Sequence, residues 1–150
     1  MASTELKSRI KDAMKAAMRA KDKPRLSTIR LIMAEIKRIE VDERIEVEDT
    51  RLIIVLDKML KQRRDSEKQY TDAGRAELAQ IEAEEIVVIQ EFLPEALSDE
   101  ELSTLVQEAV SESNASSMRD MGKVMAILQP KVQGRADMGV ISGMVKKALA

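Results

Sequence analysis

The 150-residue sequence contains no histidine and no cysteine, and these two absences narrow its chemistry more than any residue that it has. Without them, the chain lacks the commonest zinc ligands, the usual general base at neutral pH and a thiol nucleophile. Disulfide bonds within the chain are excluded as well. We therefore expect no metal site, no cofactor and no catalytic residues.

Aromatic, glycine and proline residues are also scarce. Tyr70 and Phe92 are the only aromatic side chains, and the sequence holds five glycines and three prolines. A core must then be built from Leu, Ile, Val, Ala and the ten Met, which pack adaptably. Together with a charged fraction of 35%, this composition is typical of long amphipathic helices and not of strands joined by turns. The sequence predicts an all-α fold.

Long apolar runs are missing too. No segment approaches the roughly 18 to 20 apolar residues that a membrane span requires. The pattern predicts a basic amphipathic helix over residues 4–20. Such a helix can lie on a membrane or act as a transit peptide, but Glu5, Asp12 and Asp22 favour an ordinary packed helix. We expect a cytoplasmic protein without membrane contacts.

Charge is strongly segregated along the chain although the net charge is only −2. Residues 1–40 hold 11 basic and 5 acidic side chains, a balance of +6, whereas residues 75–112 hold 1 basic and 11 acidic, a balance of −10. Two interpretations stay open. Basic and acidic helices can pack side by side and neutralise each other, or the basic segment can form a face that binds a polyanion.

The first part of the chain is expected to form a four-helix unit. Pro24 suits the first turn of a second helix, antiparallel to the first, and Gly74 is placed to end a long third helix. That helix is apolar in its first half and polar from Lys61 onward, so it should leave the core halfway along. The predicted helices cover about residues 4–20, 24–40, 50–73 and 75–92.

The remainder should form a small three-helix bundle. Ser98 and Glu101 make a capping box at the start of its first helix, and Ser117 and Asp120 have the spacing of a second box. Pro130 is expected to end the helix that follows, because proline lacks the N–H that an α-helix requires. The three predicted helices run to about residues 111, 128 and 149, and the predicted domains are residues 1–93 and 98–150.

A short basic loop is expected between the last two helices. Gly134 can adopt a left-handed backbone, and Asp137 is placed to cap the final helix. Lys131 and Arg135 lie in the same seven residues. No structural duty explains these two cations, so they are candidates for binding.

Several short motifs resemble those of the YqeY family, over nearly the whole chain. The most diagnostic are M-G-K-V-M at Met121–Met125 and K-V-Q-G-R-A-D at Lys131–Asp137, in which Gly122, Gly134 and Asp137 are structural positions. K-Q-R-R-D-S at Lys61–Ser66, A-G-R at residues 73–75 and F-L-P at residues 92–94 occur in the expected order. That family is related to the tail domain of the GatB subunit of the aspartyl/glutamyl-tRNA amidotransferase.

The resemblance implies a module that helps to hold tRNA, with an amidotransferase subunit or an aminoacyl-tRNA synthetase as a further partner. The family label, a carbon–nitrogen ligase with glutamine as amido-N-donor, describes chemistry that needs a serine nucleophile with a lysine base and a magnesium-dependent phosphoryl-transfer centre. The sequence holds neither motif. We therefore expect a non-catalytic accessory protein.

The candidate RNA-binding residues are cations on the long helix and near the C-terminus. On the long helix, pairing of Lys61 with Asp65 and of Arg63 with Glu67 at i, i+4 is an alternative explanation for part of the set. The full set comprises Lys61, Arg63, Arg64, Lys68, Lys123, Lys131, Arg135, Lys146 and Lys147.

Scarce aromatics limit how this chain can bind RNA, because the recognition of unpaired bases usually requires stacking platforms. We expect contacts to phosphates and 2′-hydroxyls of folded tRNA, which weaken as salt rises. The alternative is a protein-interaction module that docks on an amidotransferase or a synthetase through apolar helix faces without touching RNA. An exposed patch of Leu, Ile or Met would favour the second hypothesis, and a continuous basic surface the first.

Overall fold

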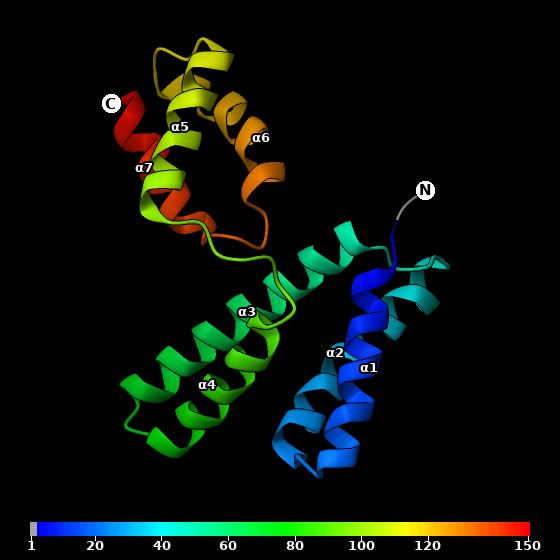
Figure 1. Cartoon of the computed structure of the whole chain (residues 1–150). Helices are drawn as coiled ribbons and strands as arrows, with labels where there is room; N and C mark the ends of the chain where they lie inside the picture. Colours follow the sequence, from blue (N-terminus) through cyan, green and yellow to red (C-terminus); the bar gives the residue numbers. More distant parts are fainter. Residues whose placement is uncertain (1–2) are drawn as a thin grey trace. The chain divides into compact units, whose positions relative to one another are not determined.

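The computed structural model describes residues 3–150, and within that range the chain is entirely helical, without a strand (Figure 1). The all-α prediction is confirmed. The chain divides into two compact units, the first ending at Leu93 and the second beginning at Pro94. The helices are α1 (Glu5–Ala20), α2 (Lys23–Glu43), α3 (Asp49–Asp72), α4 (Ala76–Gln90), α5 (Asp99–Ser113), the 3₁₀ turn η1 (Met118–Asp120), α6 (Met121–Val132) and α7 (Met138–Leu149).

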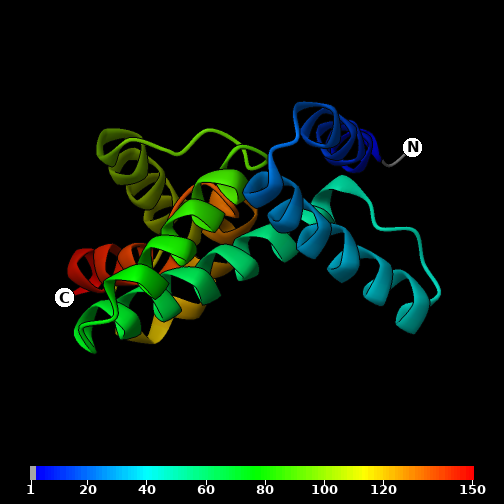
Figure 2. The ribbon, with the colours of Figure 1, turned by 90° about the horizontal axis from the view of Figure 1, so that it is seen from below.

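The first unit consists of two helical hairpins. α1 packs against α2 and α3 packs along α4, and α2 contacts both α3 and α4 (Figures 1 and 2). The hairpins close around aliphatic side chains at helical spacing, which bury apolar surface on one face of each helix. Side chains with no more than 1% of their surface exposed mark the centre of this core: Ile10, Ile29, Ile32, Val47, Leu52, Leu56 and Ile89.

The long helix α3 changes partners along its length, as its composition indicates. Its buried residues end at Leu60, and the polar second half lies along α4, where Arg63 and Tyr70 are half-buried. The helix ends at Asp72, and Gly74 follows with φ of +73°, a left-handed conformation that glycine adopts without strain. The sequence therefore favours a turn between α3 and α4 at this position.

Glu40 ties α1, α2 and the segment before α3 together. Its carboxylate accepts a hydrogen bond from the Lys7 ammonium at 2.6 Å and another from the backbone N–H of Val47 at 2.9 Å. Val47 is completely buried. This one side chain thus fixes the position of α1 against α2 and anchors the connection that leads into α3.

The second unit is a three-helix bundle of α5, α6 and α7. The capping box predicted at Ser98 is present: Ser98 Oγ accepts from the N–H of Glu101, and the Glu101 carboxylate accepts from the N–H of Ser98. The bundle core takes one apolar face from each helix. Its most buried members are Val106, Ala109, Val124, Leu128, Val132, Ile141 and Val145.

Pro130 does not end α6, contrary to the prediction. The helix continues to Val132, and Leu128 and Val132 are both completely buried one turn apart. Pro130 itself is exposed in the last turn, where the burial of Val132 offsets the loss of one backbone hydrogen bond. Lys131 consequently lies on the last turn of a helix and not in a loop.

The predicted capping box at Ser117 is also wrong in its geometry. The Ser117 side chain makes no capping bond, and residues 118–120 form a 3₁₀ turn before α6 begins at Met121. Instead, Asp120 turns its carboxylate back to accept from the N–H of Ser116 at 3.0 Å. Hydrogen bonds from the backbone N–H groups of Ser116 and Ser117 lower the pKa of Asp120.

Backbone conformation and hydrogen bonds to backbone groups hold the connection between α6 and α7. The structural roles predicted for Gly134 and Asp137 are confirmed. Gly134 has φ of +76°, and the Asp137 carboxylate accepts from the N–H of Gly139 at 2.8 Å. The carbonyl of Arg135 also accepts from the N–H of Leu97 at 2.9 Å, which joins this connection to the segment before α5.

We predict that Glu40→Gln lowers the free energy of unfolding at pH 7 by about 1 kcal/mol, because the charged partner of Lys7 is lost. The Lys7 ammonium, and then the Val47 N–H, hold the pKa of Glu40 below its ordinary value. A carboxyl with a lowered folded-state pKa contributes stability above its unfolded pKa and loses it as the pH falls through the folded value. Urea unfolding should show the difference shrinking below about pH 4.

Glu46→Gln is the matched control, because Glu46 also approaches Lys7, at 3.8 Å, but is 68% exposed. It should change stability little at any pH. Equal losses in the two variants would contradict the role assigned to Glu40.

Candidate nucleic-acid interface

Four cations lie along the outer surface of α2 and at its end. Lys23, Arg30 and Lys37 follow each other at seven-residue intervals, just under two helical turns, and span about 21 Å. Arg44 follows the end of the helix as its C-cap residue, with a left-handed backbone at φ of +55°. All four are exposed, and none takes part in an ion pair or a side-chain hydrogen bond. Their charges are therefore available to a ligand.

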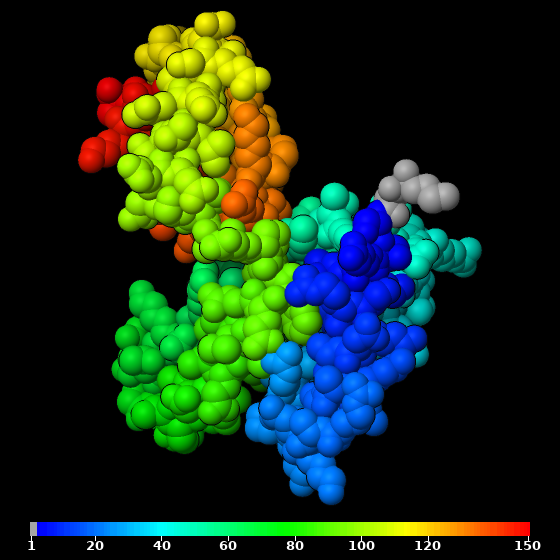
Figure 3. All heavy atoms as spheres, in the orientation of Figure 1, coloured from blue at the N-terminus to red at the C-terminus, as the bar shows by residue number. Residues whose placement is uncertain are grey.

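A second row runs along α1. Lys11, Lys15 and Arg19 are spaced at i, i+4 and i+8, are exposed, and likewise have no ion pair. Lys7 lies one turn before Lys11 and reaches Glu40 on α2, so this edge of α1 borders α2. The side chains of α1 lie at the surface of the first unit in Figure 3.

Two ion contacts show which side of the hairpin carries both rows. Arg9 donates to the carbonyl of Glu91 at 3.4 Å, and Arg25 pairs with the carboxylate of the same residue at 2.5 Å. Glu91 follows α4, so Arg9 and Arg25 mark the inner side of the hairpin. Around each helix axis, the rows lie away from the buried residues, which are Leu6, Ile10 and Ala17 on α1 and the isoleucines of α2. We call these seven cations, Lys11, Lys15, Arg19, Lys23, Arg30, Lys37 and Arg44, the α1–α2 basic face.

Few carboxylates oppose this face. On α2, the residues three or four positions before or after each cation are its neighbours on the helix surface. They are Leu, Ser, Met, Ala and Val residues and one acid, Glu40. Glu40 is already bound to Lys7 and to the Val47 N–H. On α1, Asp12 is the acid nearest to the row in sequence and forms no ion pair. The seven cations are therefore exposed and not neutralised by ion pairs within the described residues.

The four candidates on α3 separate into two sets. Lys61, Arg64 and Lys68 are exposed at i, i+3 and i+7 without an ion pair, on a surface that also carries Asp65. Arg63 instead points to α4, where its Nε lies 3.1 Å from a carboxylate oxygen of Glu85, and both side chains are about four-fifths buried. The pairings considered from sequence, Lys61 with Asp65 and Arg63 with Glu67, are not the ones that form.

Arg63 lies among several carboxylates of the α3–α4 hairpin. Burial, and then the neighbouring charge of Glu85, raises the pKa of Glu82, while Arg63 acts in the opposite direction. Arg63 therefore neutralises a half-buried acidic cluster. This internal role leaves it less available to a ligand than Lys61, Arg64 or Lys68.

The candidates of the second unit also differ in availability. Lys123 lies 3.8 Å from Asp120, and Lys131 lies 3.9 Å from Glu112. Arg135 donates from Nε to the carbonyl of Glu95 at 3.0 Å, so it helps to hold the segment before α5. Lys146 and Lys147, in the last turn of α7, are exposed and unpaired.

Gly122, a family-motif position, is exposed near the start of α6. A Cβ added there would meet no heavy atom within 4 Å outside the local helix backbone. Its backbone is helical, so neither packing nor conformation requires glycine at this position.

None of the seven residues of the α1–α2 basic face is among the candidates from sequence, although two signals for them were present. The excess of cations in residues 1–40 suggested a basic segment, but the first helix was interpreted as an ordinary packed helix. The seven-residue spacing within the second helix was the sharper signal. Arg30 and Lys37 lie within the helix predicted over residues 24–40, and Lys23 directly precedes it.

Neither a metal site nor a membrane span is found among the described residues. No group of three or more Asp and Glu side chains in residues 3–150 is arranged to hold a metal ion. None of the helices in that range is both long enough and apolar enough to cross a membrane.

Comparison with known proteins places the motifs in a family. The family model described as Yqey-like protein matches residues 7–149. Two similar proteins are both named "Altered inheritance of mitochondria protein 41, mitochondrial". The one from Pyrenophora tritici-repentis is 31% identical over 85% of this chain and 71% of its own length. The one from Clavispora lusitaniae is 38% identical over 73% and 65%, so the chain spans about two thirds of the length of these relatives.

We predict that Arg63→Ala destabilises the first unit by about 1 to 2 kcal/mol, because Glu82 and Glu85 lose the cation between them. Arg64→Ala, at the adjacent exposed and unpaired position, should stay within about 0.5 kcal/mol of the wild type. Chemical unfolding followed by circular dichroism measures both. A double-mutant cycle with Glu85→Ala should give a coupling free energy of at least about 0.5 kcal/mol, and additive effects would contradict the ion pair.

Proposed function

The chain belongs to the YqeY-like protein family, and we propose that it is a non-catalytic helical module that binds structured tRNA through the RNA backbone. In this proposal, the protein acts as an accessory to tRNA-dependent amidation or aminoacylation and has no reaction of its own. The sequence supports the second part, since it offers neither histidine nor cysteine nor a glycine-rich phosphate loop.

The observation that carries the proposal is the α1–α2 basic face. Seven exposed cations without ion pairs lie on the α1–α2 hairpin. The backbone that carries these cations is already ordered, so binding costs mainly the rotamer freedom of their side chains, and phosphate neutralisation supplies most of the affinity of sequence-independent binding. The candidate residues Lys61, Arg64, Lys68, Lys146 and Lys147 stay available as further contacts.

The two aromatic side chains support a backbone mode of binding. Phe92 is 5% exposed and belongs to the core of the first unit, and Tyr70 is half-buried on α3. Neither ring offers a free face on which an unpaired base could stack. We therefore propose recognition of the shape of a folded RNA, through phosphates and 2′-hydroxyls, with weak dependence on sequence.

The names of the relatives bear on the cellular location of the protein. Their names carry the word mitochondrial, and they are longer than the part that matches this chain. The cytoplasmic location expected from the sequence stays a prediction, as does the participation of an amidotransferase subunit or a synthetase. A role in RNA handling is compatible with either compartment.

We predict that the full chain binds total tRNA with an affinity that falls steeply between low and moderate salt. Changing Arg30 and Lys37 to Ala should weaken binding about tenfold or more and should reduce the slope of log K against log salt by about 2, roughly one for each lost phosphate contact. Fluorescence anisotropy with labelled tRNA, over a series of salt concentrations, measures both quantities.

Arg119→Ala is a control that also removes an exposed cation without an ion pair, from η1 in the second unit. Its affinity and salt slope should stay close to those of the wild type. Parallel variants Arg64→Ala with Lys68→Ala, and Lys146→Ala with Lys147→Ala, test the candidates found from sequence. An affinity that is flat with salt, or unchanged by Arg30→Ala with Lys37→Ala, would reject the α1–α2 basic face as the RNA contact.

A further inference from the structure

One stripe of exposed residues on the outer surface of α2 alternates cations with short side chains. Successive members are four or three residues apart, which keeps them on the same side of the helix. In chain order they are Lys23, Ser27, Arg30, Ala34, Lys37 and Val41, and all six are exposed. Neighbouring cations are about 10 Å apart, with one short side chain between them. A ligand can therefore approach the helix closely between the cations.

The cations of α1 lie beside those of α2. The ion pair of Lys7 with Glu40 fixes the register of the two helices. Because a two-residue link makes them antiparallel, Lys11 and Lys37 each lie about one turn from that pair, in the same direction along the hairpin (Figure 1). Packed helices are about 8 to 10 Å apart. The face thus presents cations in two adjacent lines.

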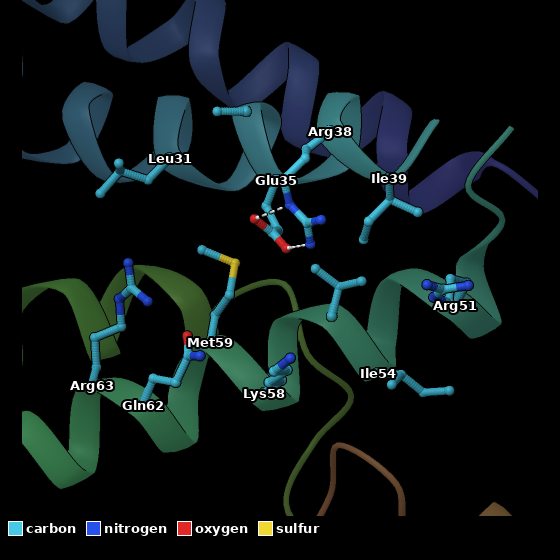
Figure 4. A pocket seen from close by; sticks show the side chains of 12 residues that line it. Leu31, Glu35, Arg38, Ile39, Arg51, Ile54, Lys58, Met59, Gln62 and Arg63 are labelled. Carbon is cyan, nitrogen blue, oxygen red and sulfur yellow. Dashed lines mark hydrogen bonds and ion pairs between the residues drawn. The ribbon is translucent and has the colours of Figure 1, made fainter. Parts of the chain in front are cut away.

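The side of α2 that borders α3 suits a polyanion less well (Figure 4). Cations line the groove there too, but most are already in ion pairs: Arg38 with Glu35 and Asp42, Arg51 with Glu43, and Arg63 with Glu85. Figure 4 shows Arg38 and Glu35 joined within the groove. Among its cations, Lys58 alone has no ion pair. Phosphates are therefore expected on the outer stripe of α2 and not in this groove.

A double-helical stem fits two lines of cations better than a single strand does. A single strand must become ordered on binding, and proteins usually offset that cost by stacking its bases on aromatic rings. Phe92 is buried and Tyr70 is half-buried, so this chain has no freely exposed ring. A stem holds the phosphates of both strands in fixed positions before it binds. Its association with ordered helices then costs less conformational entropy.

Ser27 gives the stripe a group that can distinguish RNA from DNA. Its hydroxyl lies between Lys23 and Arg30 in sequence and makes no hydrogen bond within the described residues. By contrast, the hydroxyls of Thr28 and Thr71 each donate to the carbonyl four residues earlier. A serine hydroxyl both donates and accepts, and A-form RNA displays its 2′-hydroxyls in a wide, shallow minor groove.

We propose that the α1–α2 basic face binds a double-helical RNA stem, with the stripe of α2 against the backbone that borders the minor groove. Arg30 and Lys37 contact phosphates, the Ser27 hydroxyl contacts a 2′-hydroxyl, and Ala34 marks the closest approach of the RNA to the helix. The proposal rests on the RNA binding proposed for this face and names its ligand class, of which tRNA is one member.

Three nucleic acids test the ligand class with the full chain. They are an RNA duplex of about 16 base pairs, the length that a double-stranded-RNA-binding domain spans, an unpaired RNA strand with the same number of phosphates, and a DNA duplex of the same sequence. Fluorescence anisotropy at one salt concentration should show the RNA duplex binding within about threefold of tRNA, because the phosphate contacts are the same. The unpaired strand should bind at least about tenfold more weakly, and the DNA duplex about threefold more weakly.

Two substitutions that leave the charge unchanged locate the contact. Ala34→Gln places a longer side chain between Arg30 and Lys37 and should weaken RNA-duplex binding several-fold, because it holds the backbone away from the cations. Ala126→Gln makes the same change at an exposed position on α6 and should have no effect.

Ser27→Ala should weaken binding of the RNA duplex about threefold and leave that of the DNA duplex unchanged, because only RNA carries the 2′-hydroxyl. Ser103→Ala, at an exposed position on α5, is the matched control and should change neither. Circular dichroism verifies that each variant folds.

Equal affinity for the RNA duplex and the unpaired strand would overturn the proposal, as would equal effects of Ala34→Gln and Ala126→Gln. A Ser27→Ala variant that weakens RNA and DNA binding alike, or neither, would remove the hydroxyl from the contact. Binding of tRNA without binding of the RNA duplex would reject the stem as the ligand and leave the proposed function standing. A chain that binds none of these nucleic acids, tRNA included, would reject the proposed function itself.

Discussion

Burial of one face of α2 is the interaction on which the first unit depends. Ile29, Ile32, Ile36 and Ile39 recur at helical spacing and are between 0% and 4% exposed. Each such side chain contributes roughly 1.5 to 3 kcal/mol by leaving water. Because α1, α3 and α4 all contact α2, this face fixes the orientation of the helix and hence the direction of every other side chain that it carries.

The exposed surface of α2 follows from that orientation. With the isoleucine face turned inward, Lys23, Arg30 and Lys37 are left on the outer surface of the helix. These unpaired cations suit a polyanion.

Ion pairs decide which cations of this highly charged chain are free to bind. Arg25, Arg51 and Arg63 each pair with a carboxylate on another segment, and Lys7 is engaged by Glu40. Three of these contacts join successive helices, and the fourth joins α2 to Glu91, which follows α4. Some acidic side chains thus neutralise cations between helices, and seven cations of the α1–α2 hairpin stay unpaired, as do others on α3 and α7.

The sequence by itself determined the helical class, the order of the helices, the capping box at Ser98 and the left-handed glycines Gly74 and Gly134, because each depends on local backbone chemistry or on the spacing of apolar residues. It also placed the motifs that identify the family. It failed at Pro130, where burial of Val132 overrides a local rule.

Only the tertiary structure decided which charges are paired and which surfaces stay open. Arg63 meets Glu85, 22 residues away, and not its neighbour Glu67 on the same helix. Local spacing shows which residues share a helical face, but the faces that meet each other are chosen by packing among all the helices of the unit.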